Sequence, residues 1–443
     1  FMEHVDTLIT ARWVIPIEPH GHVLDHHCVA VRQGRIVAIE PREQALRRFT
    51  ADQVIDRPTH VLLPGLVNAH THAAMSLLRG AAESSSLGHW LTVQIWPLEK
   101  RWIDAEYVRD GTELAIAEML SSGTTCFADM HLFPEVVAQT ASAARIRACV
   151  GLPVLDAASP WADSVSAYIE KGLRLHDEYR DDPLITTAFA PYTPAVVSDE
   201  TLSRLRRTAD ELDELPVIMQ INESRTDAVT EGERTLARLE RLGVLSPLLS
   251  AVHMVHADDE DLDRAAAAGI SITHCPQSNL KLGNGVCPIA AIRSRGINVA
   301  LGTNSAASNN DLNMLDEMRT AALLVSGIAA RRPERFTPMN AHDWLHAATL
   351  GGARALGLTD AIGSLVPGKW ADLCCIDLAR PQSQPVYDPA VHIVYSVSSD
   401  QVSDVWVAGR PLVTAGKHTH MDLADILRRA QDWQARIAPT RQG

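Results

Sequence analysis

The stretch VLLPGLVNAHTH, Val61 to His72, is a short apolar run that ends in two histidines. Seven further short runs rich in apolar or β-branched residues follow it: Thr124–Met130, Ile146–Asp156, Leu184–Pro194, Pro216–Glu223, Leu248–Val255, Gly269–Pro276 and Gly296–Ser305. Longer helical patterns, such as AEYVRDGTELAIAEMLSSG, separate most of these runs. Eight alternations of strand and helix over roughly 250 residues are typical of an α/β protein built as a (β/α)8 barrel of the TIM type. A doubly wound open sheet is the alternative.

The two ends of the chain differ from this middle part, because both read as short strands joined by turns. DTLITARWVIPI lies near the start, and GKWADLCCIDL lies near the other end. We therefore predict that residues 1–60 and 366–420 form one small composite β-sandwich beside a barrel of residues 61–365. Residues 421–443, which include MDLADILRRAQDWQARI, predict an amphipathic surface helix.

Composition restricts the class of partner. The hydrophobic content of 46% and the charged content of 21% are ordinary for a globular protein. A net charge of −14 argues against a nucleic-acid partner, since phosphate binding needs clustered Lys and Arg. No apolar run is long enough to span a membrane, and the first residues do not form the pattern of a signal peptide. The seven cysteines show no CxxC spacing, so we expect reduced thiols and a cytoplasmic location.

The active site of a TIM barrel lies at the carboxyl ends of its strands, so the residues at those ends are informative. His70 and His72 stand two apart on the first strand, and their side chains therefore point to the same side. Two imidazoles placed in this way can bind one transition-metal ion. Two histidines that face a polar cavity without a metal are the alternative.

Polar side chains also stand at the ends of later strands. They are Tyr192, Gln220, Asn222, Glu223, His253, His256, His274, Asn279, Asn304 and Ser305. Glu223 has the strongest individual case, because a carboxylate inside a barrel mouth needs a partner or a function. For His256 and His274 a packed or surface position is the simpler interpretation. Lys281 reads as a solvated loop residue and Cys275 as a small buried filler.

Five motifs together carry a family resemblance: PGLVNAHTHAAMSLLRG, SSGTTCFADM, THCPQSNLKLGNG, ALGTNSAASNNDLNM and GSLVPGKWADL. With them the chain resembles the amidohydrolase superfamily, and within it the bacterial aminohydrolases that deaminate 5-methylthioadenosine, S-adenosylhomocysteine and adenosine. The resemblance implies a barrel with a composite β-sandwich and a small purine-nucleoside substrate. It also implies zinc or a similar divalent metal as cofactor, and it leaves the presence of a homo-oligomer open.

The resemblance also implies roles for individual residues. His70 and His72 match two metal ligands, Glu223 matches the acid/base that handles the proton of the purine ring nitrogen, and His253 matches the strand-six histidine. The bound metal lowers the pKa of a water molecule, which then attacks the carbon that carries the amino group. We expect the substrate to contact Trp90, Tyr192, Asn222, His131 and Ser305.

The chain departs from the family pattern at the positions that carry the chemistry. Strand five of the family has His-x-x-Glu, whereas this chain has Gln220-Ile221-Asn222-Glu223. Strand eight has Gly-Thr-Asp, whereas this chain has Asn304 in the last place. An amide oxygen is a poor zinc ligand compared with imidazole, and an asparagine side chain cannot take a proton as a carboxylate does. We therefore expect impaired deamination and weak metal binding at His70, His72, His253 and Gln220.

The clustering of these changes at the pocket favours an engineered or designed variant over a natural homologue that has diverged. The new small residues Ser84–Ser86 and Gly88, in the loop that covers the pocket, point the same way. Three functions remain open: an active deaminase, a barrel whose pocket was rebuilt for another small molecule, and a binding protein without enzymatic activity. For a rebuilt pocket the groups able to do acid/base work are Tyr192, His131, His253, Glu223 and His89.

Overall fold

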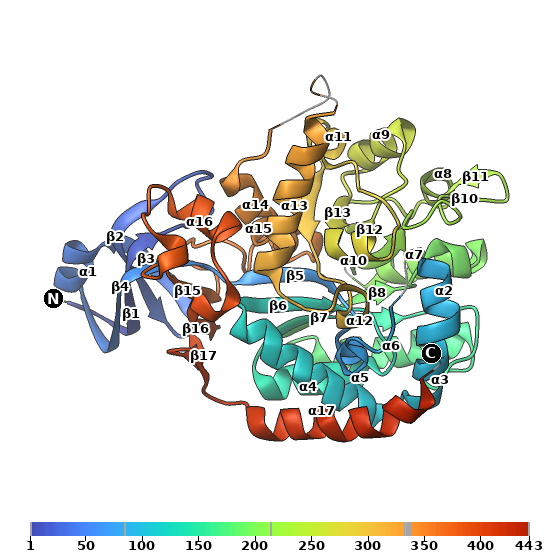
Figure 1. Ribbon diagram of the computed structural model, residues 1–443, viewed down its shortest axis with the longest axis horizontal. Coiled ribbons are helices and arrows are strands. Elements are labelled where there is room, and N and C mark those ends of the chain that lie inside the picture. The colour runs from blue at the N-terminus through green and yellow to red at the C-terminus, as the bar shows by residue number, and fades with distance from the viewer. Residues whose placement is uncertain (1, 84–85, 213–214, 332, 334–337, 442–443) are drawn as a thin grey trace.

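The barrel is a closed ring of eight parallel strands. The computed structural model describes residues 2–83, 86–212, 215–331, 333 and 338–441. Its barrel sheet has the strand order β14-β13-β12-β9-β8-β7-β6-β5 (Figure 1). The strands are β5 (Leu66–Thr71), β6 (Thr124–Asp129), β7 (Arg147–Pro153), β8 (Ile185–Ala190), β9 (Val217–Ile221), β12 (Leu249–His253), β13 (Ser271–His274) and β14 (Asn298–Leu301).

The first and last barrel strands meet just past their carboxyl ends. Thr71 and Asn304 form a parallel bridge, and the backbone N–H of Asn304 donates to the carbonyl of His70 at 2.9 Å. Gly302 allows this approach, because a Cβ atom there would lie 2.9 Å from the Cβ atom of His70. The closure confirms the predicted barrel and excludes the open doubly wound sheet.

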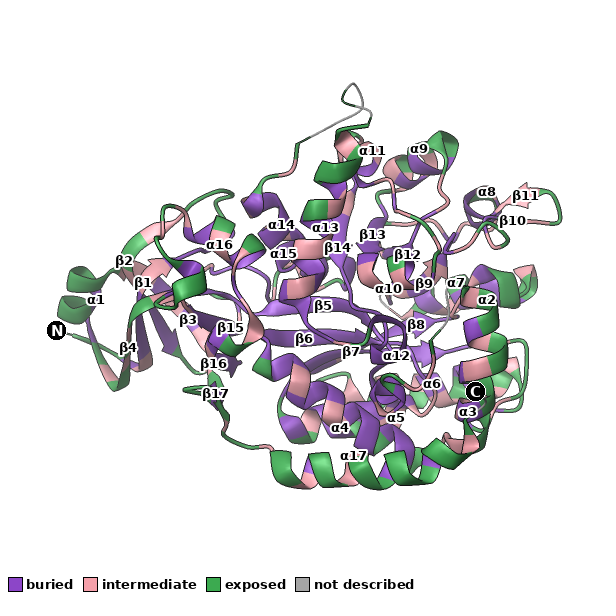
Figure 2. Ribbon diagram, in the orientation of Figure 1, coloured by how far each residue is buried: buried purple, intermediate pink, exposed green. Residues whose placement is uncertain are grey.

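Helices surround the barrel and bury the outer faces of its strands, while their own outer faces remain exposed (Figure 2). The helices of the barrel region are α2 (Leu87–His89), α3 (Trp96–Trp102), α4 (Ala105–Ser121), α5 (Pro134–Ala144), α6 (Val165–Tyr179), α7 (Asp199–Glu211), α8 (Thr235–Arg241), α9 (Asp259–Ala268), α10 (Pro276–Lys281), α11 (Ile289–Ser294), α12 (Ala306–Asn309), α13 (Met314–Ala329), α14 (Ala341–Ala347) and α15 (Leu350–Ala355). Shorter elements are η1 (Ala73–Leu78), η2 (Trp90–Ile95), η3 (Pro194–Val196), β10 (Val229–Thr230) and β11 (Glu233–Arg234). The helices α2 and α3 stand at the end of the barrel away from the second large sheet (Figure 1).

The second large sheet joins the two ends of the chain, in the order β18-β17-β16-β15-β4-β1-β2-β3. Its strands are β1 (Glu3–Val14), β2 (Leu24–Arg32), β3 (Arg35–Pro41), β4 (Phe49–Pro64), β15 (Leu373–Asp377), β16 (Val402–Val407), β17 (Arg410–Thr414) and β18 (Lys417–His418). The contact between the two ends is made where β15 pairs with β4 in antiparallel fashion. The helices α1 (Arg42–Arg48) and α16 (Pro389–Tyr395) belong to the same terminal segments.

The predicted first barrel strand, residues 61–72, is divided between the two sheets. Residues 61–64 end β4 of the composite sheet, and β5 begins only at Leu66. The chain passes from one sheet to the other at Gly65. Only glycine fits there, because a Cβ atom would lie 1.9 Å from Oγ1 of Thr125 on β6. The apolar run has no break because both sheets bury it, so its pattern does not reveal the division.

The last long helix, α17 (Leu423–Ile437), lies along the outside of α4 (Figure 1). Trp433 is its buried anchor, and the indole N–H donates to Asp110 at 2.9 Å. Within the described part of the chain, no helix has the length and apolar character needed to cross a membrane. All seven cysteines are buried and free.

Candidate active site

Two buried histidines occupy the carboxyl end of β5. The ring centroids of His70 and His72 lie 4.8 Å apart, with the ring planes at 85°. Nδ1 of His72 bonds the carbonyl of Met130, whereas Nε2 of His70 has no hydrogen-bond partner among the described residues. Burial lowers the pKa of both imidazoles, that of His70 well below its ordinary value. Both rings are therefore neutral near pH 7, which is the form that binds a metal ion.

The opposite side of the mouth carries an amide in contact with a third histidine. Oε1 of Gln220 lies 3.1 Å from Nε2 of His253, and Nε2 of Gln220 lies 3.5 Å from the sulfur of Met130. The Nδ2 amide of Asn279 donates to Nδ1 of His253 at 3.1 Å. This bond leaves the ring proton on Nε2 of His253, from where it is donated to Gln220. Burial lowers the pKa of His253 to about 3, so the ring is neutral.

Glu223 follows β9 and is also buried at the mouth. Its Oε1 accepts from Nδ2 of Asn284 at 3.2 Å and lies 3.6 Å from Nε2 of His253. Burial, aided by the negative charge of Asp227, raises the pKa of Glu223 to about 8, although the bond from Asn284 opposes the rise. Near neutral pH the carboxyl group thus holds a proton that it can donate.

Asn304 stands immediately beyond β14 with a positive φ of 59°. Its backbone contacts β5 through the bond to His70 described above. Asn and Asp both tolerate this left-handed conformation better than most residues. An amide in place of a carboxylate therefore keeps the backbone geometry of the barrel closure while it removes the negative charge.

Tyr192, which the resemblance predicts to contact substrate, lies beside His72. Its ring is nearly parallel to that of His72, at 17° and a centroid distance of 6.5 Å. Tyr192 has a φ of 57°, which is unusual for a bulky residue, and its carbonyl accepts from the N–H of Gln220 at 2.6 Å. Burial raises the pKa of its hydroxyl well above the ordinary value, so the phenol stays protonated.

Two other predicted substrate contacts are directed elsewhere. The side chain of Asn222 is buried, and its Nδ2 lies 3.4 Å from Asp261 of α9. The hydroxyl of Ser305 caps α12 by accepting from the N–H of Ser308 at 3.0 Å. Both side chains therefore form hydrogen bonds within the protein. Their positions in the sequence did not show whether they would contact substrate or other protein groups.

The remaining predicted residues lie just past the end of β6 and on the segment from α2 to η2. His131 pairs with Glu99 of α3 at 2.9 Å, and Trp90 is buried on η2. Burial lowers the pKa of His131, but the hydrogen bond and charge of Glu99 outweigh it and the pKa is raised. His89 is exposed. Ser84 and Ser85 lie outside the described residues.

Sequence reasoning missed two carboxylates near these groups, the buried Asp129 and the half-buried Glu99. Asp129 ends β6 and accepts from the hydroxyl of Thr71 at 3.0 Å and from the N–H of Ala73 at 2.7 Å. Its place at a strand end was a usable signal. Glu99 gave none, because it is a helix residue that only the fold brings to His131.

The side chains at the barrel mouth fit a metal ion only in part. His70 and His72 are neutral, and Nε2 of His70 is an unpartnered buried atom of the kind that a ligand satisfies. Gln220 and Asn304 contribute neither an imidazole nor a charge. Across the residues that the structure describes, only His4, Asp6 and Asp52 bring three His, Cys or acidic ligand atoms within 4.8 Å of one another, and they lie on the composite sheet. The barrel mouth therefore offers two good ligands where the resemblance implies four.

Comparison with known proteins identifies the family of this chain. The model of the amidohydrolase family matches residues 61–412. A 5-methylthioadenosine/S-adenosylhomocysteine deaminase from Teredinibacter turnerae is 43% identical over 444 residues, which covers 99% of each chain. The chain belongs to the amidohydrolase family.

Solved structures of similar proteins agree with this assignment. An adenosine deaminase from Xanthomonas campestris with bound zinc is 44% identical, with a TM-score of 0.96 over 99% of this chain and 100% of the other. A zinc complex of atrazine chlorohydrolase from Arthrobacter aurescens is 25% identical, with a TM-score of 0.87 over 96% and 99% of the two chains. These findings confirm the resemblance and the deaminase-type scaffold. They imply a small-molecule substrate and support a divalent metal, zinc, as the cofactor of this scaffold.

Proposed function

We propose that this amidohydrolase is a purine-nucleoside aminohydrolase whose hydrolytic deamination is impaired. The observation that carries the proposal is Glu223, a buried and protonated carboxyl group beside His253 at the mouth of a deaminase-type barrel. The substrate class comes from the relatives, which include 5-methylthioadenosine/S-adenosylhomocysteine and adenosine deaminases.

Glu223 supports one half of the reaction. Hydrolytic deamination adds water to the ring carbon that carries the amino group, and ammonia then leaves. The neighbouring ring nitrogen must gain a proton as the water adds, and a carboxyl group with a pKa of about 8 can donate it near neutral pH. Tyr192 supplies an aromatic ring beside His72 against which a flat base can pack.

The other half of the reaction is impaired. Removing a proton from the attacking water calls for a base at the mouth, and neither the amide of Asn304 nor that of Gln220 can accept that proton. His253 is a weak base because burial lowers its pKa to about 3. His70 and His72 are the residues that would hold zinc, which when bound lowers the pKa of a water molecule.

The test measures ammonia release from 5-methylthioadenosine and from adenosine, together with zinc content, in this chain and in the double variant Gln220→His, Asn304→Asp. We expect slow or undetectable turnover and substoichiometric zinc in the chain itself. The double variant should gain both activity and about one zinc per chain. A double variant with zinc but no nucleoside deamination would contradict the proposed substrate class.

A rebuilt pocket for a different small molecule is the second candidate. It is favoured by Tyr192, a bulky residue with a positive φ that lies beside His72, one of the two histidines matched to metal ligands. Strained residues of this kind concentrate at functional sites. Isothermal titration with a panel of nucleosides tests the choice, because tight nucleoside binding by the chain as it stands supports the aminohydrolase proposal. The engineered origin of the replacements stays a prediction, which the same residues in a natural genome would contradict.

A further inference from the structure

A cavity lies at the opposite end of β14 from Asn304. Its volume is about 590 Å³, it is open to solvent on one side, and it is lined by α11, the start of β14, α14 and α15. The polar lining residues are Arg293, Ser294, Asn298, Asp343, His346 and Arg354. Small-molecule sites usually occupy about 300–1,000 Å³, so the space suits a ligand of metabolite size.

Asp343, the carboxylate that lines this cavity, already has ion-pair and hydrogen-bond partners within the protein. Asp343 receives the guanidinium of Arg293 at 2.9 Å and Nε2 of His20 at 3.1 Å. Its second oxygen accepts from the backbone N–H of Asn340 at 2.8 Å, in a capping box at the start of α14. The negative charge of Asp343 is therefore balanced within the protein and does not repel an anion from the cavity.

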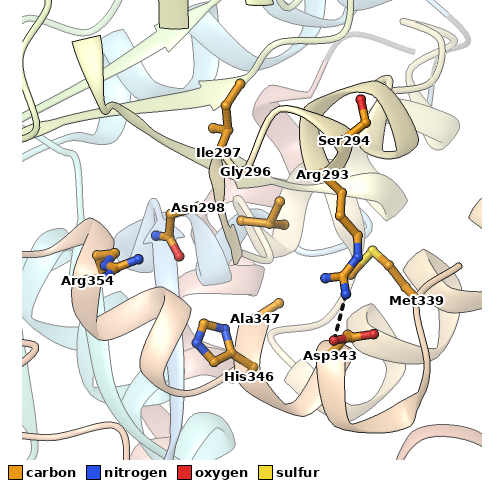
Figure 3. A pocket seen from close by; sticks show the side chains of 11 residues that line it. Arg293, Ser294, Gly296, Ile297, Asn298, Met339, Asp343, His346, Ala347 and Arg354 are labelled. Atoms are coloured by element: carbon orange, nitrogen blue, oxygen red, sulfur yellow. Dashed lines mark ion pairs between the residues drawn. The ribbon is translucent and has the colours of Figure 1, made fainter. Parts of the chain in front are cut away.

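Two other titratable lining groups, Arg354 and His346, have free donors. Among the described residues, neither Arg354 nor the ring of His346 has a side-chain hydrogen bond or an ion pair. Figure 3 shows Arg293 and Arg354 on opposite sides of the space, with His346 between them. Burial, together with the positive charges of His20 and Arg354, lowers the pKa of His346, although the negative charges of Asp343 and Glu18 oppose the shift.

Arg354 is thus a lining arginine without an ion pair among the described residues, in a chain whose net charge is −14. An arginine fork suits the paired oxygens of phosphate and carboxylate groups. Ile297, Val299 and Ala347 add an apolar side to the same cavity. We propose that this cavity binds a small organic anion that carries a phosphate or carboxylate group. The site is separate from the barrel mouth and does not depend on the proposed deaminase activity.

The experiment is isothermal titration of the full chain with glycerol 3-phosphate, inorganic phosphate and citrate, none of which is a nucleoside. We expect at least one of them to bind, and Arg354→Gln to weaken that binding at least tenfold. Arg354→Lys keeps the charge but loses the fork, so its affinity should fall between the two. Arg207→Gln is the matched control, since Arg207 is an exposed arginine of α7 that does not line the cavity.

Binding of a phosphate probe without citrate assigns the phosphate class, and the reverse assigns the carboxylate class. The absence of binding by all three probes at millimolar concentration overturns the proposal, as does equal affinity in Arg354→Gln and the unchanged chain. Circular dichroism checks that each variant is folded. His346→Gln provides a second variant on another wall, and we expect it also to weaken binding.

Discussion

The strand ends at the barrel mouth share a backbone plan but differ in chemistry. At the end of β5, His70 and His72 form a histidine pair of neutral, buried imidazoles. At the ends of β9 and β14, Gln220 and Asn304, here called the amide pair, occupy the positions where the resemblance implies a histidine and an aspartate. The backbone groups of the amide pair still bond Tyr192 and His70. Strand closure thus fixes where a site lies, because backbone bonds do not depend on which side chain the position carries.

The largest effect should come from converting the amide pair. Gln220→His with Asn304→Asp restores an imidazole and a carboxylate, so we expect deamination to rise by about 10,000-fold, since a metal-activated water and a proton acceptor both return. Initial-rate assays and elemental analysis measure the outcome. Asn222→His is the control on the same strand, because that side chain faces Asp261 and should restore neither zinc nor activity. Unchanged rates in the double variant would mean that the pocket has been rebuilt beyond these two positions.

A smaller effect separates proton donation from metal binding. Adding Glu223→Gln to the double variant should lower kcat by about 100-fold, because the amide cannot donate the carboxyl proton. Zinc content should not change, since Glu223 is not among the matched ligands. Loss of zinc together with activity would instead assign Glu223 to the metal site.

The histidine pair can be tested in the chain as it stands. His72→Ala removes one of two retained ligands, so we expect zinc affinity to fall by at least about tenfold. Competition with a chromophoric chelator measures the change, and His256→Ala is the control, because that ring bonds the carbonyl of Asn284 instead. Equal affinity in the His72→Ala variant would place the bound zinc elsewhere, for example at His4, Asp6 and Asp52.

The smallest effect concerns Glu317, whose partner Asn309 also donates to the carbonyl of Thr303, the neighbour of Asn304. Glu317 is fully buried, accepts from the N–H of Gln277 at 3.0 Å and from Asn309 at 2.7 Å, and burial raises its pKa to about 8. Between pH 4.5 and 8 the folded state keeps a proton that the unfolded state releases, so the free energy of unfolding falls as pH rises. The slope is at most about 1.4 kcal/mol per pH unit for one group.

Urea unfolding between pH 5 and pH 8 measures this slope. Glu317→Gln should make it shallower, whereas Glu170→Gln, on the exposed face of α6, should leave it unchanged. An identical slope in the Glu317→Gln variant would mean that other groups, such as Glu223, carry the pH dependence.

The barrel, the composite sheet and the strand ends that carry polar groups could be predicted from the amino-acid pattern. Strand and helix patterns are local and repeat along the chain, and parallel strands must present their carboxyl ends at one face. The same reasoning placed His70, His72 and Glu223 at strand ends, whereas the resemblance to the family implied that Gln220 and Asn304 replace a histidine and an aspartate.

How those side chains are used follows instead from contacts that the fold makes between distant segments. The fold divided residues 61–72 between two sheets at Gly65, turned Asn222 toward Asp261 and paired His131 with Glu99. It also gave Glu223 a raised pKa, since burial depends on every element packed around the carboxyl group. These outcomes depend on partners that are distant in sequence, and no local pattern records which partner the fold will bring.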